Sequence, residues 1–390
     1  MGGTLDIISP LARGFGGELQ PLTEGKNQKE VFGFAPFWTI NKLENVDYDV
    51  LTTVAYFGVP IMGDGSIDTD YPGYKTFKSD RATEIFKKAH AHGTRVVLTV
   101  VQMENEEILA LMDDQEAQDR SIANTVELVK SRGIDGVNID FEYTGDPGIE
   151  YRLKFTEYVR RMNSAMKVAV PSSRVTVSVY ASAMKDPKIY DIASIAQHSD
   201  GIFMMAYDFA VAGSANAIPT APLYGYKEGK YWYDVSTAVE DFLAVMPAEK
   251  LILGVPWYGY NYSVNAPKVK APTQKALGRG FAQTYALAQN DVSENMPGIY
   301  EYATGWDEHG QVGWKAYYVA ANDTWRMVFI DDVKSLGKKF EFAKQKNLGG
   351  IGMWALGFDD GKNDFWALLH KEFGAKYADA HIVNKQIENM

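Results

Sequence analysis

Cysteine is absent from the 390 residues of this chain, and its absence excludes several kinds of chemistry at once. Disulfide bonds, thiol nucleophiles, iron–sulfur clusters and zinc sites with Cys ligands cannot form without it. Long hydrophobic runs are missing as well, since no stretch of about 18 apolar residues predicts a membrane span. The chain begins Met1-Gly2-Gly3, which is not the start of a secretory signal peptide.

Basic residues are outnumbered by acidic ones. The chain has 39 Lys and Arg against 50 Asp and Glu, a formal net charge of −11. Nucleic acid and anionic membranes are therefore excluded as expected partners, because no basic surplus is present to neutralise phosphates. A neutral ligand such as a sugar stays possible. Aromatic residues make up 13% of the chain and would suit a sugar-binding cleft or a large core, and composition leaves both open.

Short apolar, β-branched or aromatic runs recur along the chain after residue 30. Each is about eight residues long, as buried strands are. Helical spacing of apolar residues fills most of the intervals, for example at Ala117–Ser131 and Glu150–Lys167. The predicted strands are Val31–Trp38, Thr52–Val59, Arg95–Gln102, Gly136–Tyr143, Arg174–Ala181, Gly201–Asp208, Lys250–Trp257 and Gly349–Leu356.

Eight strands alternating with helices predict an α/β fold, a (β/α)8 TIM barrel. A doubly wound open sheet is the alternative, but it usually has fewer strands per domain and a Gly-rich phosphate turn, which the sequence lacks. We expect an N-terminal arm or linker over 1–30, the barrel over 31–258 and 333–375, and a C-terminal tail over 376–390. Residues 259–332 interrupt the alternation, and we expect them to form a small α+β insertion between the seventh and eighth strands.

The segment Asp135-Gly-Val-Asn-Ile-Asp-Phe-Glu142 has the clearest chemical pattern in the chain. Side chains alternate along a strand, so Asn138, Asp140 and Glu142 share one face and the apolar residues share the other. In a barrel the polar face points inward. Burying an unpaired carboxylate costs several kcal/mol, so two of them there need a reason. A solvated edge or internal salt bridge is the alternative, but the strand contains no Lys or Arg.

This motif resembles the signature of glycoside hydrolase family 18, the chitinases and their relatives. Three other predicted strand ends resemble family motifs in the right order: Met205-Ala-Tyr-Asp208 at the sixth strand, Gly254-Val-Pro-Trp-Tyr-Gly259 at the seventh and Gly350-Ile-Gly-Met-Trp354 at the eighth. The resemblance spans most of residues 31–375. It implies a retaining glycosidase that cleaves β-1,4 bonds at N-acetylglucosamine in chitin or chitooligosaccharides, without a metal or other cofactor.

The resemblance also implies roles for individual residues. Glu142 would protonate the glycosidic oxygen and later deprotonate water, while the substrate's own acetamido oxygen attacks the anomeric carbon. Asp140 would hold the acetamido N–H, and Tyr207 would hold its carbonyl. The negative charge of Asp140 would raise the pKa of the acid. Asp135 would support the motif, and the residues expected to bind the sugar are Trp354, Asp208, Met205, Asn138, Trp257 and Tyr258.

Two departures from the family pattern stand out. Asn138 occupies a position where the family most often has Asp, which shares a proton with its neighbour. We expect Asn138 to hydrogen-bond Asp140 without taking its charge, so that Asp140 stays ionised over a wider pH range. The third strand has Leu98-Thr-Val-Val-Gln102 in place of the family's Ser-x-Gly-Gly, which puts the usual contacts there in doubt.

Within the family, the motifs look most similar to the di-N-acetylchitobiase branch, and spore-cortex hydrolases look similar as well. The first implies short chitooligosaccharides or the chitobiose core of glycans, and the second implies peptidoglycan. Since no LysM-like repeat or carbohydrate-binding module is visible, we favour chitooligosaccharides. Such substrates usually lie outside the cell, so a secreted or cell-envelope location is expected. The sequence gives no indication of an oligomeric state.

Two other classes of function compete with this interpretation. A lectin-like relative on the same barrel would bind sugar without cleaving it, but such proteins typically replace the acid, which is present here. A metal-dependent hydrolase or phosphate-binding lyase would need His or Lys at strand ends, and the six His lie outside the predicted strands. His90 and His92 do not face each other on a helix, so we expect a solvated helix end there and no metal pair.

Overall fold

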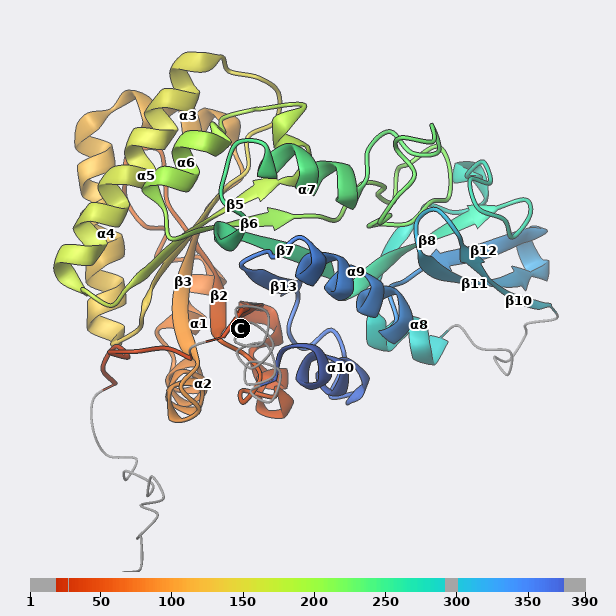
Figure 1. The fold of residues 1–390 in the computed structure, drawn as a ribbon, viewed down its shortest axis with the longest axis horizontal. Coiled ribbons are helices and arrows are strands. Elements are labelled where there is room, and N and C mark those ends of the chain that lie inside the picture. The colour runs from red at the N-terminus through yellow and green to blue at the C-terminus, as the bar shows by residue number, and fades with distance from the viewer. Residues whose placement is uncertain (1–18, 27, 292–300, 375–390) are drawn as a thin grey trace, which may run out of the picture.

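A closed barrel of eight parallel strands forms the centre of the computed structural model, which describes residues 19–26, 28–291 and 301–374 (Figure 1). The barrel confirms the predicted (β/α)8 architecture. Around the barrel, each strand pairs with the next in the order β1 (Glu30–Pro36), β13 (Gly350–Trp354), β7 (Leu251–Pro256), β6 (Gly201–Met205), β5 (Arg174–Tyr180), β4 (Gly136–Phe141), β3 (Arg95–Gln102) and β2 (Thr53–Pro60).

Helices cover the outside of the barrel, and capping residues mark where they begin and end. Helix α4, for example, begins where the Asp114 side chain accepts hydrogen bonds from two backbone N–H groups, and it ends at Gly133 with a φ of 60°. The helices around the barrel are α1 (Pro72–Phe77), α2 (Asp80–Ala91), α3 (Asn105–Asp113), α4 (Gln115–Arg132), α5 (Ile149–Ala169), α6 (Ile192–His198), α7 (Val235–Leu243), α9 (Val333–Gln345) and α10 (Asp364–Phe373).

Short 3-10 helices connect several of these elements. They are η1 (Phe37–Asn45), η2 (Ala181–Met184), η3 (Ala248–Lys250), η4 (Lys275–Leu277) and η5 (Ala320–Asn322). Within the described ranges, no helix is both long and apolar enough to cross a bilayer.

Aromatic rings fill the inside of the barrel. Phe34 packs edge-to-face on Phe203 with ring centroids 4.8 Å apart, and Phe32 lies 5.4 Å from Phe203. All three side chains are buried, and they form one cluster with inward-facing residues of β2, β3 and β7. Strand side chains alternate, so the other half of each strand packs outward against the helices. Phe34 reaches up to Trp354, 5.5 Å away, so this inner cluster ends beneath the mouth of the barrel.

A second sheet lies beside the barrel, between its seventh and eighth strands in sequence (Figure 1). It is antiparallel and packs around a small core of its own that includes Tyr262, Met327 and Phe329. Helix α8 (Tyr285–Asp291) follows its edge strand. The strand order is β10 (Tyr302–Asp307), β11 (Val312–Val319), β12 (Thr324–Phe329), β8 (Tyr258–Val264) and β9 (Phe281–Thr284). Of the expected arm and tail, residues 1–18 and 376–390 lie outside the described residues.

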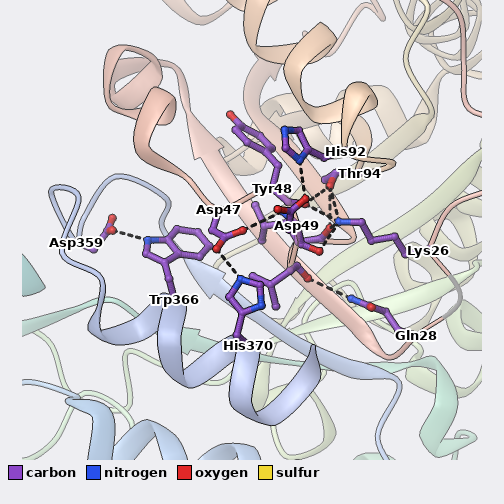
Figure 2. A network of polar contacts seen from close by, with 12 residues as sticks. Lys26, Gln28, Asp47, Tyr48, Asp49, His92, Thr94, Asp359, Trp366 and His370 are labelled. Carbon is purple, nitrogen blue, oxygen red and sulfur yellow. Dashed lines mark hydrogen bonds and ion pairs between the residues drawn. The ribbon is translucent and has the colours of Figure 1, made fainter. Parts of the chain in front are cut away.

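The N-terminal segment is tied to the end of the barrel where the strands begin. Lys26 Nζ donates to the backbone carbonyls of Tyr48, Asp49 and Leu51 at 2.5, 2.7 and 2.7 Å, and to Thr94 Oγ1 at 3.1 Å. Asp49 in turn pairs with a histidine that follows α2, and Asp47 pairs with another on α10 (Figure 2). These contacts join the N-terminal segment to the loop before β2, and they join that loop to the end of α2 and to α10.

A buried ion pair holds the segment after β12 to helix α9. Lys339 and Asp331 form this pair, and their side chains are only 1% and 2% exposed. Burial raises the pKa of Asp331, and the nearby Lys339 ammonium opposes that rise. A pair this deep gives little net stability, but each partner depends on the other because an isolated buried charge is expensive.

We therefore expect Lys339→Met to lower the free energy of unfolding by about 3 kcal/mol, since Asp331 would be left buried without its cation. The neighbouring Lys338 is exposed, and Lys338→Met removes the same charge at the surface, where we expect a change of at most about 0.5 kcal/mol. Urea unfolding followed by tryptophan fluorescence measures both. Equal midpoints for the two variants would show that the buried pair is not required.

Candidate active site

A cavity of about 290 Å³ opens at the end of the barrel where the strands finish. Its walls come from the ends of β1, β2, β4, β5, β6 and β13, from residues that follow β3, β4 and β6, and from the first residue of β8. This is the face on which TIM barrels carry their active sites. The lining residues are Phe34, Phe57, Met103, Asp140, Glu142, Tyr180, Met205, Tyr207, Asp208, Tyr258 and Trp354.

Most of the residues predicted for the site line this cavity. They are Glu142, Asp140, Tyr207, Trp354, Asp208, Met205 and Tyr258. Three others, Asn138, Trp257 and Asp135, lie elsewhere. The remaining lining residues, among them Tyr180 and Phe57, were not singled out in the sequence, because an aromatic residue inside a predicted strand is equally typical of a core.

Two acidic groups share the floor of the cavity. Asp140 is only 3% exposed, and its Oδ1 is buried with no hydrogen-bond partner among the described residues. Burial raises the pKa of Asp140 well above its ordinary value, and the neighbouring Glu142 charge raises it further. Burial also raises the pKa of Glu142. Such a pair keeps a proton at a pH where isolated carboxyl groups have lost theirs, so it can supply an acid.

The amide of Asn138 does not serve Asp140, and the expected hydrogen bond between them is wrong. Asn138 is fully buried below the cavity, where its Nδ2 donates to Ser178 Oγ at 2.9 Å and its Oδ1 accepts from Thr176 Oγ1 at 2.8 Å. Both the nitrogen and the oxygen of the amide therefore hydrogen-bond side chains of β5. No donor from Asn138 therefore opposes burial and the Glu142 charge, which raise the pKa of Asp140. The direction of this shift runs against the expectation that Asp140 stays ionised over a wider pH range, which stays a prediction.

Trp257 faces away from the cavity. Its side chain is 1% exposed and packs on two rings of α10, with centroids 5.2 Å from Phe365 and 5.3 Å from Trp366. The next residue, Tyr258, lines the cavity. Alternation along an extended backbone sends these neighbours in opposite directions, so only one of the two can reach a ligand there.

Asp135 lies at the opposite end of β4, where it holds the chain together. Its carboxylate accepts from the backbone N–H groups of Leu22 and Val96, each at 2.6 Å, and pairs with His90 Nε2 at 2.7 Å. The His90 side chain is 7% exposed, so the expected solvated helix end is wrong for this histidine. Asp135 therefore joins the N-terminal segment, α2 and β3 below the barrel, and it does not contact the cavity.

Two tyrosine hydroxyls hold Asp208. Tyr258 Oη donates to Asp208 Oδ1 at 2.5 Å, and Tyr260 Oη donates to the same oxygen at 3.0 Å. The backbone of Asp208 has a φ of 59°, in the left-handed region. Burial raises the pKa of Asp208, and the two hydroxyls oppose the rise. Tyr260, on β8, was not predicted as a site residue because it belongs to the insertion.

Trp354 forms an apolar wall of the cavity. Its ring lies 4.7 Å from Phe57 at an angle of 87° and 5.5 Å from Phe34. Trp38, whose side chain is 53% exposed, continues this wall outward at 6.3 Å from Trp354. Apolar C–H faces of a sugar pack on rings of this kind. The cavity thus combines acidic groups on one side with an aromatic surface on the other.

Asp140 should destabilise the fold as the pH rises. A carboxyl group whose pKa is higher in the folded state than in the unfolded chain stabilises the folded state at low pH, and that contribution is lost above the unfolded pKa of about 3.9. Asp140→Asn carries no proton to lose. Relative to its effect at pH 4, we expect this variant to gain about 1–3 kcal/mol of stability over wild type at pH 7.

Thermal unfolding of both proteins between pH 4 and pH 8 measures this difference, with the exposed Glu228→Gln as the matched neutralisation at the surface. A constant offset between wild type and Asp140→Asn across the pH range would contradict the raised pKa.

The chain was compared with known proteins. The model of the glycosyl hydrolases of family 18 matches residues 30–359. Rat di-N-acetylchitobiase is 29% identical over 332 residues, which cover 80% of this chain and 77% of that protein. Mouse chitotriosidase-1 is 28% identical over 256 residues, 63% of this chain and 53% of that protein. The chain thus spans only about half the length of some curated relatives.

Among solved structures, the family 18 chitinase of Cycas revoluta in complex with (GlcNAc)3 superposes with a TM-score of 0.71 at 21% identity. The superposition covers 88% of this chain and 98% of that one, so the two share the fold. The family match extends from β1 to beyond β13 and includes every strand that lines the cavity. This chain therefore belongs to the glycosyl hydrolases of family 18.

Proposed function

We propose that this chain is a retaining glycosidase that cleaves β-1,4 bonds next to N-acetylglucosamine in chitooligosaccharides, with the substrate's own acetamido group as the nucleophile. The observation that carries the proposal is the burial of Asp140 beside Glu142 in a cavity walled by Trp354 and Tyr207. Relatives named chitobiase and chitotriosidase, and a structural neighbour that binds (GlcNAc)3, support the choice of sugar.

Glu142 moves the protons in both halves of this reaction. In the first half its carboxyl group gives a proton to the glycosidic oxygen, the bond from that oxygen to the anomeric carbon breaks, and the acetamido oxygen bonds to the same carbon. In the second half the Glu142 carboxylate takes a proton from water. The water oxygen bonds to the anomeric carbon, and the acetamido group is released. The raised pKa of Glu142 suits the first half.

Asp140 receives the acetamido N–H in this scheme. Its Oδ1 is buried without a hydrogen-bond partner among the residues described, and an N–H donor from the substrate would satisfy it. That hydrogen bond would favour ionised Asp140, whose negative charge then lies next to the positive oxazolinium intermediate. Substrate binding thus supplies the stabilisation that Asn138 does not give.

Tyr207 and Trp354 orient the reacting sugar. We assign the Tyr207 hydroxyl to the acetamido carbonyl, which fixes its oxygen for in-line attack on the anomeric carbon. The Trp354 ring would pack on the apolar face of the same sugar. Asp208, held by two tyrosine hydroxyls, and Met205 complete the wall around it.

Turnover of 4-methylumbelliferyl conjugates of one, two and three N-acetylglucosamine units tests the proposal. We expect wild type to release the fluorophore and Glu142→Gln to lose a factor of about 10² or more in kcat, because the amide cannot donate an acidic proton. The exposed Glu106→Gln removes a charge outside the cavity and should keep the wild-type rate.

Two other outcomes would overturn the assignment to chitooligosaccharides. Turnover of peptidoglycan, with none of the chitooligosaccharide conjugates cleaved, would identify a cortex-type hydrolase. Binding of (GlcNAc)3 by wild type without cleavage of any substrate would identify a lectin-like protein.

A further inference from the structure

Tyr180 is the lining residue that acts most directly on Glu142. It is the last residue of β5 and lines the same cavity as Glu142. A hydrogen bond from its side chain lowers the pKa of Glu142 against the effect of burial. Burial and the nearby Glu142 charge raise the pKa of Tyr180 itself above its ordinary value, so the hydroxyl keeps its proton and serves as the donor. Nothing in the roles derived above uses this contact.

The ammonium group of Lys188 lies over the ring of Tyr180. Its Nζ lies 5.1 Å from the ring centroid and 3.1 Å from an Asp186 carboxylate oxygen, and its side chain is 15% exposed. The backbone at Lys188 has a φ of 54°, and its carbonyl accepts a hydrogen bond from Arg152 at 3.1 Å. The ammonium is therefore held in place by ring, carboxylate and backbone, and its charge lowers the pKa of Glu142.

Tyr190 braces the same region against β4. Its hydroxyl donates to the backbone carbonyl of Phe141 at 2.7 Å, one residue before Glu142, and its ring lies 6.1 Å from that of Tyr180. Tyr190 is 1% exposed. The segment from 180 to 190 thus contacts both the backbone that carries Glu142 and the Glu142 carboxyl group.

The groups around Glu142 have opposing effects on its negative charge. Burial and the charge of Asp208, the last residue of the motif that follows β6, disfavour a negative charge on Glu142. Tyr180, at the end of β5, and Lys188, in the segment after it, favour that charge. The titratable groups that face Glu142 or its neighbours are Asp140, Asp208, Tyr180, Lys188, Tyr190, Tyr207 and Tyr258.

We propose that Tyr180 is a positioning residue for Glu142, and that Lys188 reinforces it from behind the Tyr180 ring. The inference rests on the proposed function of Glu142 as acid and then base. The Tyr180 hydroxyl donates to the carboxylate that must form when Glu142 gives up its proton, and it fixes which oxygen faces the sugar. Together the two residues set the pH at which Glu142 changes from acid to base.

The sign of the effect follows from the donor. Without the Tyr180 hydroxyl, ionised Glu142 loses a hydrogen bond, so the pKa of Glu142 rises and its acid form persists to higher pH. In Tyr180→Phe we therefore expect the alkaline limb of the kcat/KM profile to move up by about one pH unit. We also expect a lower kcat, because the base is less well oriented. Lys188→Met should move the same limb in the same direction by less, since the hydroxyl stays.

The pH profiles of wild type, Tyr180→Phe and Lys188→Met on a 4-methylumbelliferyl chitooligosaccharide test the proposal. Lys185→Met is the matched control, because Lys185 also lies over an aromatic ring, at 4.8 Å from the Tyr226 centroid, but is not among the charges that act on Glu142. A control profile that equals wild type, with graded shifts in the other two variants, supports the proposal. An unmoved alkaline limb in Tyr180→Phe overturns it, and an unmoved limb in Lys188→Met alone overturns the part given to Lys188.

A second measurement separates this inference from the proposed function. In protein labelled with carboxyl-13C glutamate, the NMR resonance that Glu142→Gln removes reports the titration of Glu142 without any turnover. A higher pKa of that resonance in Tyr180→Phe than in wild type supports the inference even if no chitooligosaccharide is cleaved, which would refute the proposed function. An unchanged pKa overturns the inference.

Discussion

The structure depends on the burial of two carboxyl groups at the end of one barrel strand. Strand β4 places Asp140 and Glu142 two residues apart on its inner face, and the rings of Phe34 and Trp354 keep the space around them apolar. In a low dielectric the charged forms of both groups are disfavoured, so burial raises both pKa values, and the Glu142 charge raises that of Asp140 further. The same arrangement that costs the fold stability retains an acidic proton where a glycosidic oxygen could receive it.

The fold and the floor of the site followed from local patterns in the sequence. Runs of about eight apolar residues separated by helical spacing predicted a barrel, and strand alternation correctly put Asp140 and Glu142 on one inner face. Alternation does not say which neighbouring strand a buried side chain will meet. Asn138 was assigned to Asp140 on sequence proximity, whereas the register of β4 against β5 brings Thr176 and Ser178 to it.

The residues that the sequence did not reveal act through contacts between distant segments. An aromatic residue that ends an apolar strand, such as Tyr180, has the same local pattern whether it fills a core or faces a carboxyl group. Lys188 belongs to a polar loop, where a lysine is normally solvated, but its backbone is left-handed and its ammonium lies over the Tyr180 ring. Tyr260 reaches Asp208 across 52 positions of sequence. Periodicity carries no information on contacts of this range.

The two ends of the barrel differ in how completely their buried polar groups are hydrogen-bonded. Where the strands begin, Lys26 has four acceptors and Asp135 has three partners, so these groups are saturated and hold the chain together. Where the strands finish, Asp140 keeps a buried oxygen without a partner among the described residues. A buried polar atom left unsatisfied costs about 1–3 kcal/mol, and a ligand that brings an N–H to it recovers that cost. Under the proposed function, this incomplete end of the barrel is the one that would distinguish an acetamido sugar from one that lacks the amide.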